Sequence, residues 1–240
     1  MRLSVIIPAY NEESRIAKTL RSASQYLRNQ TYEYEIIVVD GGSKDNTVGL
    51  VQQLKKEIPY LNVLQVENKG KGYAVKQGML ESHGEYCVFM DADNSTTVDH
   101  VEKMWSSFQQ GSGVVIGSRD IEGAVIAVPQ PGWRIFLGNV FNIIVQVMSG
   151  LWGMWDTQCG FKGFSRKAVR SIFPKSRING WAFDVEILMI AKSCGFEIEE
   201  IPVTWVNDPD SKVKFSGMVK MLFEVLFARW NMLIGKYAER

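Results

Sequence analysis

Short apolar runs rich in valine and isoleucine recur through the first half of this 240-residue chain, with helical patterns between them. Runs of this length, bounded by turn residues, are typical of strands that are buried on both faces. Between the first two runs, Ile16, Leu20 and Leu27 mark one face of a helix, and Asn11 is its expected N-cap. This alternation predicts an α/β fold, with a Rossmann-like, mainly parallel sheet flanked by helices. The strands are expected at residues 3–8, 34–40, 61–66, 86–91 and 114–117.

The composition is that of an ordinary globular protein and excludes several functional classes. Hydrophobic residues make up 46% and charged residues 22% of the chain, which suits one large domain with a sizeable core. With 27 Lys and Arg against 26 Asp and Glu, no global positive field favours a nucleic-acid partner. The three cysteines are widely spaced and lack zinc-type spacing, which favours a reducing compartment. The N-terminal apolar run breaks at Pro8 without a cleavage site, so we expect a strand there and not a signal peptide.

Two segments of the second half are unusually apolar. The first, at about 134–155, has no charged residue after its first position, and its length approaches the roughly 20 residues of a membrane span. The second, at about 216–235, carries only a thin polar line of Lys220, Glu224 and Asn231 among large apolar residues. We expect two C-terminal amphipathic helices that lie at a membrane interface. A membrane-crossing segment, and helices that simply pack on the domain, are the alternatives.

Two carboxylates follow the apolar run at 86–91 and are the strongest chemical signal in the sequence. Asp91 and Asp93 are separated by Ala92, so a turn at the strand end allows one or both to reach a single cation. Mg²⁺ and Mn²⁺ prefer such oxygen ligands and complete their coordination with water and substrate phosphates. The metal would neutralise charge on a departing diphosphate. Because an Asp-x-Asp pair is also common at solvated turns, the neighbouring loops must indicate whether this pair binds a metal.

Two further loops are expected at the same edge of the sheet. Asp40 ends the run at 34–40 and is followed by two glycines, and its carboxylate can accept hydrogen bonds from a base or a ribose. The loop 68–72 places Lys71 before a helix, where its ammonium group and flexible backbone N–H groups can bind a diphosphate. Since ligands bind at the carboxyl ends of parallel strands, these two loops and the Asp91 loop are expected to form one site.

These ordered motifs are similar to those of the family 2 glycosyltransferases, which have the GT-A fold. The resemblance rests on residues 4–13, 38–43, 68–72, 91–93 and 117–119. Later motifs resemble the group of dolichyl-phosphate glucosyltransferases and dolichyl-phosphate mannose synthases, and they lie at 156–162, 181–186 and 211–213. The likeness runs from about residue 3 to the C-terminus and is closer to the glucosyltransferases. We therefore expect one catalytic domain, with a nucleotide-sugar-binding half at 1–120 and an acceptor-binding half at 121–240.

The resemblance implies particular roles for particular residues. The residues implied to bind the donor nucleotide sugar are Pro8, Tyr10, Glu12, Asp40, Lys71, Asp91, Ala92 and Asp93. Asp91 and Asp93 would also hold Mg²⁺ or Mn²⁺. The residues implied to face the acceptor phosphate are Arg119, Arg134 and Lys212. The candidate catalytic residues are Asp93, Arg119 and Asp184, of which the last could orient the sugar, act as a base or be structural.

The implied reaction moves a sugar from a nucleotide diphosphate sugar to a polyprenyl phosphate. Such a phosphate has a second pKa of roughly 6, so near neutral pH it is mostly a dianion and needs no strong general base. It needs positioning and nearby cations, which arginine and lysine supply. A single in-line displacement would invert the anomeric centre and give a β-linked lipid-phosphate sugar. UDP-glucose is the favoured donor and GDP-mannose the alternative, and we expect a peripheral or monotopic protein on the cytoplasmic face of a membrane.

Two departures from the family pattern bear on the donor. Gly41 stands where the family commonly has a second aspartate, which removes one contact to the nucleotide. Ser95 stands where the mannose synthases can have a glutamine, which weakens the GDP-mannose hypothesis. Two different functions stay open beside lipid glycosylation: a family 2 transferase with a soluble or polysaccharide acceptor, and a membrane module that binds a nucleotide sugar without turnover. A dinucleotide-binding oxidoreductase is disfavoured because no Gly-x-Gly-x-x-Gly follows the first strand.

Overall fold

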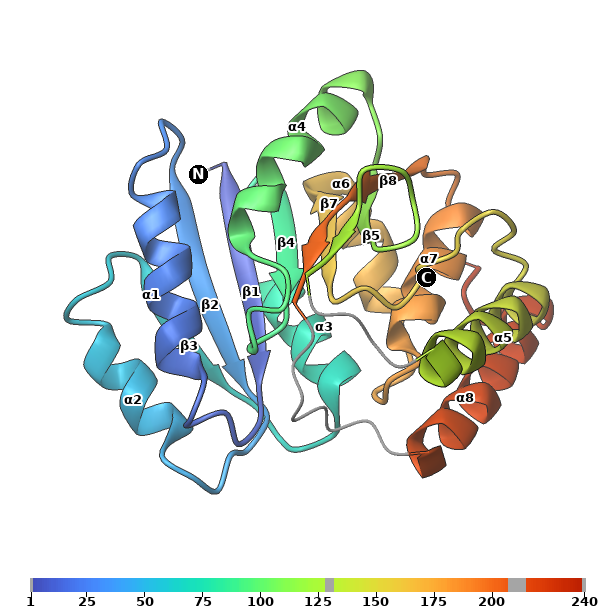
Figure 1. Ribbon diagram of the computed structural model, residues 1–240, viewed down its shortest axis with the longest axis horizontal. Helices are drawn as coiled ribbons and strands as arrows, with labels where there is room; N and C mark the ends of the chain where they lie inside the picture. The colour runs from blue at the N-terminus through green and yellow to red at the C-terminus, as the bar shows by residue number, and fades with distance from the viewer. Residues whose placement is uncertain (1, 128–131, 207–214, 239–240) are drawn as a thin grey trace.

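A computed structural model describes residues 2–127, 132–206 and 215–238, and of 132–137, 215–216 and 218 it describes the backbone alone. Figure 1 shows a twisted sheet with helices on both faces. The strands in this part of the chain are β1 Leu3–Ala9, β2 Tyr34–Asp40, β3 Leu61–Gln65, β4 Tyr86–Met90, β5 Val114–Ser118, β6 Val125–Ile126, β7 Phe161–Ser165, β8 Ile198–Pro202 and β9 Thr204–Trp205. The helices are α1 Ile16–Leu27, α2 Thr47–Leu54, α3 Lys71–Glu81, α4 Val101–Gln110, α5 Gly132–Ser149, α6 Arg166–Ile172, α7 Phe183–Ser193 and α8 Phe215–Leu233, with short 3₁₀ turns η1 Val98–His100 and η2 Phe173–Lys175.

The central sheet has seven strands in the order β3-β2-β1-β4-β7-β5-β8. Every neighbouring pair is parallel except the two that involve β7, which runs antiparallel between β4 and β5. A small second sheet pairs β6 with β9. The expected mainly parallel sheet flanked by helices is confirmed, and all five predicted strands lie within one residue of their expected ends. Strands from both halves of the chain share this one sheet, since β7 inserts between β4 and β5.

The alternation of side chains along each strand divides the interior into two cores. Leu3, Val5 and Ile7 of β1 face the core that α1, α2 and α4 cover, whereas Ile6 faces the core under α3, α6 and α7. Each strand is therefore apolar on both faces, which explains the continuous valine and isoleucine runs. The same parallel arrangement brings the carboxyl ends of β1, β2 and β4 to one edge of the sheet.

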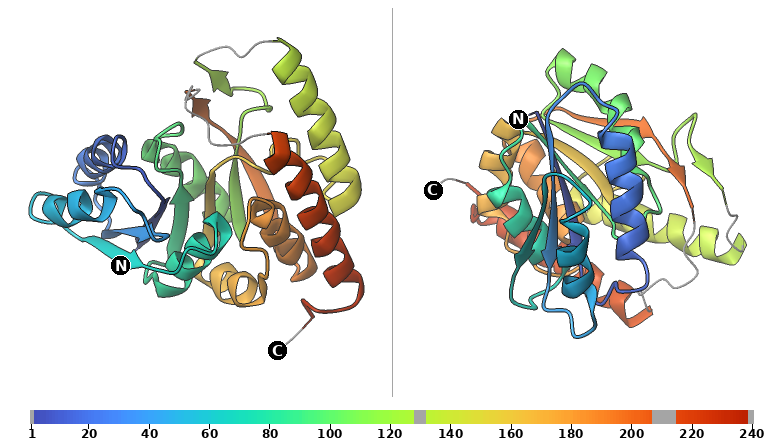
Figure 2. Two further views of the ribbon diagram at one scale, coloured as in Figure 1. Left: turned by 90° about the horizontal axis from the view of Figure 1, so that it is seen from below. Right: turned by 90° about the vertical axis from the view of Figure 1, so that its left-hand side faces the viewer.

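Helices α5 and α8 lie side by side (Figure 2) and contribute Phe141, Val145, Met221, Val225 and Ala228 to the core under α3, α6 and α7. Residues 150–155 were expected to extend the first of these helices, and that expectation is wrong. Gly150 takes a left-handed backbone with φ +74°, and α5 ends at Ser149. In the described part of the chain, no helix has both the length and the apolar character needed to cross a membrane.

The expectation that Asn11 caps the first helix is also wrong. Helix α1 begins five residues later, with Arg15 at its N-cap position. Asn11 has a positive φ of 53°, its side-chain oxygen accepts the Lys44 backbone N–H at 2.8 Å, and its own N–H donates to the Ser43 hydroxyl at 2.9 Å. Asn11 therefore joins the loop after β1 to the loop after β2, beside the predicted site.

Candidate active site

The centre of the site is an ion pair at the carboxyl edge of the sheet. Asp91 follows the last residue of β4, and Lys71 is the first residue of α3. The Lys71 ammonium lies 2.6 Å from the Asp91 carboxylate, and both side chains are only partly exposed. The two loops that the sequence predicted to converge therefore meet here, as the strand topology requires.

The surroundings of Lys71 keep it positively charged. Its ammonium group lies 5.4 Å from the centre of the Trp181 ring and 5.8 Å from that of Phe183, within the range of cation–π attraction. Burial by itself would lower the pKa of Lys71, but the negative charges of Asp91 and Asp184 outweigh it and raise the pKa above its usual value. Lys71 is thus a fixed cation suited to an anionic ligand at the open side of this edge.

Asp93 and Asn94 supply further oxygen atoms beside Asp91. One Asp93 carboxylate oxygen accepts the Ser95 backbone N–H at 2.9 Å. Burial, together with the negative charge of Asp91, raises the pKa of Asp93, so the negative charge in this loop is not fully compensated. Asn94 has a positive φ of 59°, and its buried side-chain oxygen has no hydrogen-bond partner among the described residues.

These oxygen atoms fit a hard divalent cation. A cation near Asp91 and Asp93 would offset their mutual repulsion, and carboxylate and amide oxygens are what Mg²⁺ and Mn²⁺ prefer. Within the ranges that the structure describes, no group of three or more His, Cys, Asp or Glu side chains could hold a metal alone. Asp91 and Asp93 suit a metal that shares its coordination with substrate phosphates and water.

The loop between α5 and β7 presses against the Asp91 carboxylate. A Cβ atom built on Gly160 would collide with both Asp91 carboxylate oxygens, so only glycine permits this approach. Sequence reasoning assigned no role to Gly160. Gly160 lies inside the 156–162 motif, which is the feature of the sequence that marks it. Its contact with Asp91 depends on the antiparallel insertion of β7, which the sequence did not predict.

Asp184 is buried and paired with a lysine. The Lys162 ammonium lies 2.6 Å from the Asp184 carboxylate, and both side chains are almost completely shielded from solvent. Burial raises the pKa of Asp184, although the charges of Lys162 and Lys71 oppose that rise. Of the three roles open to Asp184, this geometry favours the structural one, with a carboxylate that supports the charge arrangement around Lys71.

Residues predicted to surround the nucleotide lie at the ends of β1 and β2. Asp40 is buried, and its carboxylate accepts the backbone N–H groups of Gly42 and Ser43 at 3.1 Å each. Glu12 is buried too and lies 2.6 Å from the Arg15 guanidinium. Both carboxylates therefore fix the shapes of their own loops, whatever contacts they make with a ligand.

The remaining three donor-site candidates differ in exposure. Tyr10 is exposed at the end of β1, whereas Pro8 is buried within that strand opposite Val39. Ala92 is buried, and its carbonyl oxygen accepts the Thr19 hydroxyl at 2.6 Å. Tyr10 is consequently the one member of this group of three whose side chain is exposed to solvent.

Arg119 directly follows β5 and is held by Asp156. Asp156 belongs to the 156–162 motif, but the sequence predicted no role for it. The Arg119 guanidinium makes two parallel hydrogen bonds of 2.7 Å to the carboxylate of buried Asp156 and lies 5.1 Å from the Trp205 ring centre. Burial would raise the pKa of Asp156, but the Arg119 charge lowers it below its usual value. Of the predicted acceptor cations, Arg119 is the one whose side chain is described, since Arg134 is described by its backbone alone and Lys212 lies outside the described residues.

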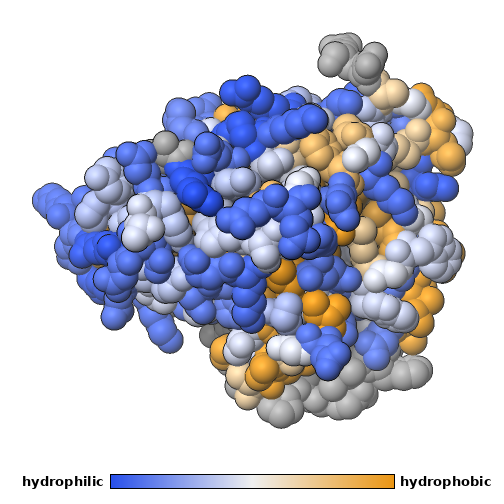
Figure 3. Space-filling view, turned by 90° about the horizontal axis from the view of Figure 1, so that it is seen from above, coloured by the Kyte–Doolittle hydropathy of each residue, from blue (hydrophilic) through white to orange (hydrophobic). Residues whose placement is uncertain are grey.

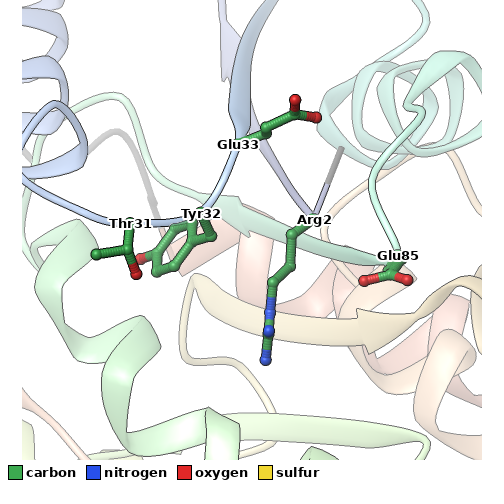
Figure 4. A pocket seen from close by; sticks show the side chains of 5 residues that line it. All are labelled: Arg2, Thr31, Tyr32, Glu33 and Glu85. Carbon is green, nitrogen blue, oxygen red and sulfur yellow. The ribbon is translucent and has the colours of Figure 1, made fainter.

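A hollow of about 320 Å³ lies at the opposite edge, where β1, β2 and β4 begin (Figure 4). Its lining residues are Arg2, Thr31, Tyr32, Glu33 and Glu85. The Arg2 guanidinium lies 5.1 Å from the Trp105 ring centre, within the range of cation–π attraction. The residues that line it precede the strands, so this hollow is distant from Asp91 and takes no part in the candidate site.

A mainly parallel sheet with one antiparallel insertion, and with an Asp-x-Asp pair and a lysine at its carboxyl edge, defines a glycosyltransferase of the GT-A class. The chain belongs to glycosyl transferase family 2, whose family model matches residues 4–173. Among solved structures, the Mycobacterium tuberculosis glucosyl-3-phosphoglycerate synthase in complex with Mn²⁺, UDP and glucosyl-3-phosphoglycerate has the same fold, with a TM-score of 0.71 at 18% identity, covering 100% of this chain and 81% of that one.

Curated relatives are similar over most of the chain. A Trichomonas vaginalis dolichyl-phosphate beta-glucosyltransferase, ALG5C, is 40% identical over 92% of this chain and 68% of its own length. The dolichyl-phosphate beta-glucosyltransferases of Saccharomyces cerevisiae and Homo sapiens are 35% and 36% identical, over 99% and 98% of this chain and 77% of each relative.

Proposed function

We propose that this protein is a hexosyltransferase that transfers glucose from UDP-glucose to dolichyl or another polyprenyl phosphate. The observation that carries the proposal is the Lys71–Asp91 pair beside Asp93, which provides a fixed cation and oxygen ligands where a nucleotide diphosphate would bind. The curated relatives, at 35% to 40% identity over most of the chain, support the choice of glucose and of a lipid-phosphate acceptor.

On the donor side, each residue has a distinct task. Lys71 offsets the negative charge of the diphosphate, and its place at the start of α3 adds the positive end of a helix dipole. Asp91 and Asp93 would hold Mg²⁺ or Mn²⁺, which when bound neutralises charge on the UDP leaving group. Tyr10 and Asp40 would contact the base and ribose from the ends of β1 and β2.

On the acceptor side, the nucleophile is the phosphate dianion, so the protein needs to hold it and need not remove a proton from it. Arg119, Arg134 and Lys212 would supply the positive charge that lets two anionic groups approach. Asp156 fixes the plane of the Arg119 guanidinium through two hydrogen bonds, which orients its remaining N–H groups. In-line attack would invert the anomeric centre and give a β-linked product.

The acceptor is a lipid, and an apolar surface on α5 and α8 fits a membrane. Figure 3 shows hydrophobic residues gathered on the right side, which carries both helices in Figure 1. This surface, the apolar face, comprises the exposed residues Val140, Ile143, Ile144, Val147, Val219, Phe223, Leu226, Phe227, Trp230 and Leu233. Trp152 and Trp155 are exposed just after α5, and tryptophan is favoured at membrane interfaces. The protein would thus be peripheral or monotopic, and we propose that it lies on the cytoplasmic face of the membrane.

A donor panel tests the proposal directly. The protein is incubated with a polyprenyl phosphate, Mg²⁺ or Mn²⁺, and labelled UDP-glucose or GDP-mannose, and the organic phase is extracted. We expect label in the organic phase from UDP-glucose only, and its loss when the metal is chelated. Label from GDP-mannose instead would refute UDP-glucose as the donor. Transfer only to a water-soluble acceptor would refute a lipid phosphate as the acceptor.

A further inference from the structure

The segment 177–182, which precedes α7, packs directly against the first turn of α3. The Asn179 carbonyl oxygen accepts the Gly72 backbone N–H at 2.9 Å. A Cβ atom on Gly70 would collide with that same carbonyl oxygen, and one on Gly72 would collide with Phe183 and with the Ile178 carbonyl oxygen. The two glycines beside Lys71 therefore permit close packing of this segment, and the Gly72 N–H is already used within the protein and not free for a phosphate.

The same segment is held from its other side by carboxylates of α7 and α8. Glu186 of α7 accepts the backbone N–H groups of Arg177 and Ile178 at 3.0 and 2.9 Å, and also the Tyr237 hydroxyl at 2.6 Å. Glu224 of α8 accepts the Ala182 N–H at 3.1 Å. Since Ala182 is the N-cap residue of α7, the Glu224 charge also lies at the positive end of that helix.

Two side chains connect this packing to the candidate active site. Trp181, within the segment, lies over the Lys71 ammonium at 5.4 Å, and Lys71 in turn pairs with Asp91. A shift of the segment would therefore move both the ring over Lys71 and the backbone that supports the start of α3. Glu224 itself makes no contact with Lys71 or Asp91 among the interactions of the described residues.

We infer that Glu224 is a positioning residue for the donor diphosphate, which rests on the proposed function of this site. Its carboxylate fixes the segment 177–182 against α3, so that Lys71 stays in place beside Asp91. Glu224 belongs to the helix of the apolar face but points inward, so its contribution differs from membrane contact. Its loss should weaken binding of the donor and leave the acceptor and the chemical step little affected.

The test compares Glu224→Ala with Glu224→Gln, and with Lys220→Gln as the matched control on the same helix. E224A removes the carboxylate that binds the Ala182 N–H, so we expect it to raise the KM for UDP-glucose and the Kd for UDP with Mn²⁺ about tenfold or more. We expect kcat and the acceptor KM to stay within about twofold. E224Q keeps an oxygen acceptor and should restore most donor affinity, and K220Q should match wild type because its ammonium lies 3.9 Å away at the exposed end of the pair.

A second variant keeps the comparison decisive should E224A unfold. A Cβ atom at Gly180 would collide with the Glu224 carboxylate, so G180A displaces that group without deleting it. We expect G180A to weaken UDP binding as E224A does, and the double variant to be no weaker than E224A. UDP binding is measured by calorimetry without an acceptor. If the wild-type protein labels no lipid, the proposed lipid acceptor is refuted, while the role of Glu224 in UDP binding is still tested. Wild-type UDP affinity in folded E224A or G180A would overturn the role of Glu224.

Discussion

The apolar face gives the sharpest prediction, because its contribution can be calculated from exposure. Phe223, Phe227 and Trp230 are 68%, 51% and 60% exposed along one side of α8. Fully burying a large apolar side chain is worth roughly 1.5–3 kcal/mol, so a half-exposed one that enters a bilayer interface gains about 1 kcal/mol. Replacing all three with serine should therefore cost about 3 kcal/mol, or roughly a hundredfold in the membrane partition coefficient.

The assay is co-sedimentation with vesicles of neutral phospholipid, with the partition coefficient taken from the bound fraction across lipid concentration. Leu80→Ser is the matched control, because Leu80 is also a helical apolar residue, 42% exposed, but lies on α3 away from the apolar face. We expect L80S to bind vesicles as wild type does. We also expect the triple α8 variant to keep its affinity for UDP, since its substituted side chains point outward.

Two results would refute the reasoning. A triple variant that partitions within about threefold of wild type would mean that α8 does not contact the bilayer. An equal loss in L80S would mean that the assay responds to total apolar surface and not to this face. Retained vesicle binding combined with lost activity would instead place these residues at the lipid acceptor.

Three further predictions concern the site itself. Asp91→Asn and Asp93→Asn should each lower the metal-dependent turnover of UDP-glucose by about a hundredfold or more, as expected when a charge-stabilising group is lost. If both variants behave as wild type does, the result would instead favour a module that binds the nucleotide sugar without turnover. Because burial and Asp91 raise the pKa of Asp93, its proton binds at higher pH than usual and competes with the metal. Mn²⁺ affinity, measured by calorimetry, should therefore fall on acidification before ordinary carboxylates titrate, and a fall that begins only where ordinary carboxylates titrate would contradict this. Asp156→Ala leaves the largely buried Arg119 unpaired and should lower the free energy of unfolding by about 3 kcal/mol, measured in denaturant, whereas an unchanged midpoint would show that the pair is not stabilising.

The sequence predicted the first half of the fold well because its strands are buried on both faces. A run such as 34–40 has few interpretations other than a central strand, and its carboxyl end had to lie beside that of 3–8 once the sheet was parallel. The convergence of Lys71 and Asp91 followed from that topology. By contrast, β7 carries Lys162 in its interior, and a charged residue in a short run does not indicate a buried strand. The Asp184 carboxylate, the Cys159 carbonyl oxygen and the Phe89 ring together make this burial tolerable. No local pattern predicts a carboxylate partner 22 residues away.

Helix α8 shows a second limit of reasoning from periodicity. The segment at about 216–235 is helical, as predicted, but the period of its polar line of Lys220, Glu224 and Asn231 does not say which side meets the protein. In the structure Asn231 is buried and Glu224 binds the α7 N-terminus, so much of the polar line faces inward and large apolar residues face outward. Met221, Val225 and Ala228 are buried as well, so α8 is apolar on both sides, whereas an ordinary surface helix is polar on its outer side.

This arrangement gives one rigid element two separate uses. A residue such as Phe223 contacts whatever lies outside the protein, whereas its neighbour Glu224 holds the backbone that supports Lys71. Consecutive residues of a helix point about 100° apart, so the two contacts do not compete for space. A lipid-phosphate acceptor binds from a bilayer surface, whereas the donor diphosphate binds from water. Helix α8 carries residues for both, since its apolar residues suit the bilayer and Glu224 supports the donor site. With the roles proposed for Glu224 and the apolar face, the helix would fix the donor site at a set position relative to the surface from which the acceptor would arrive.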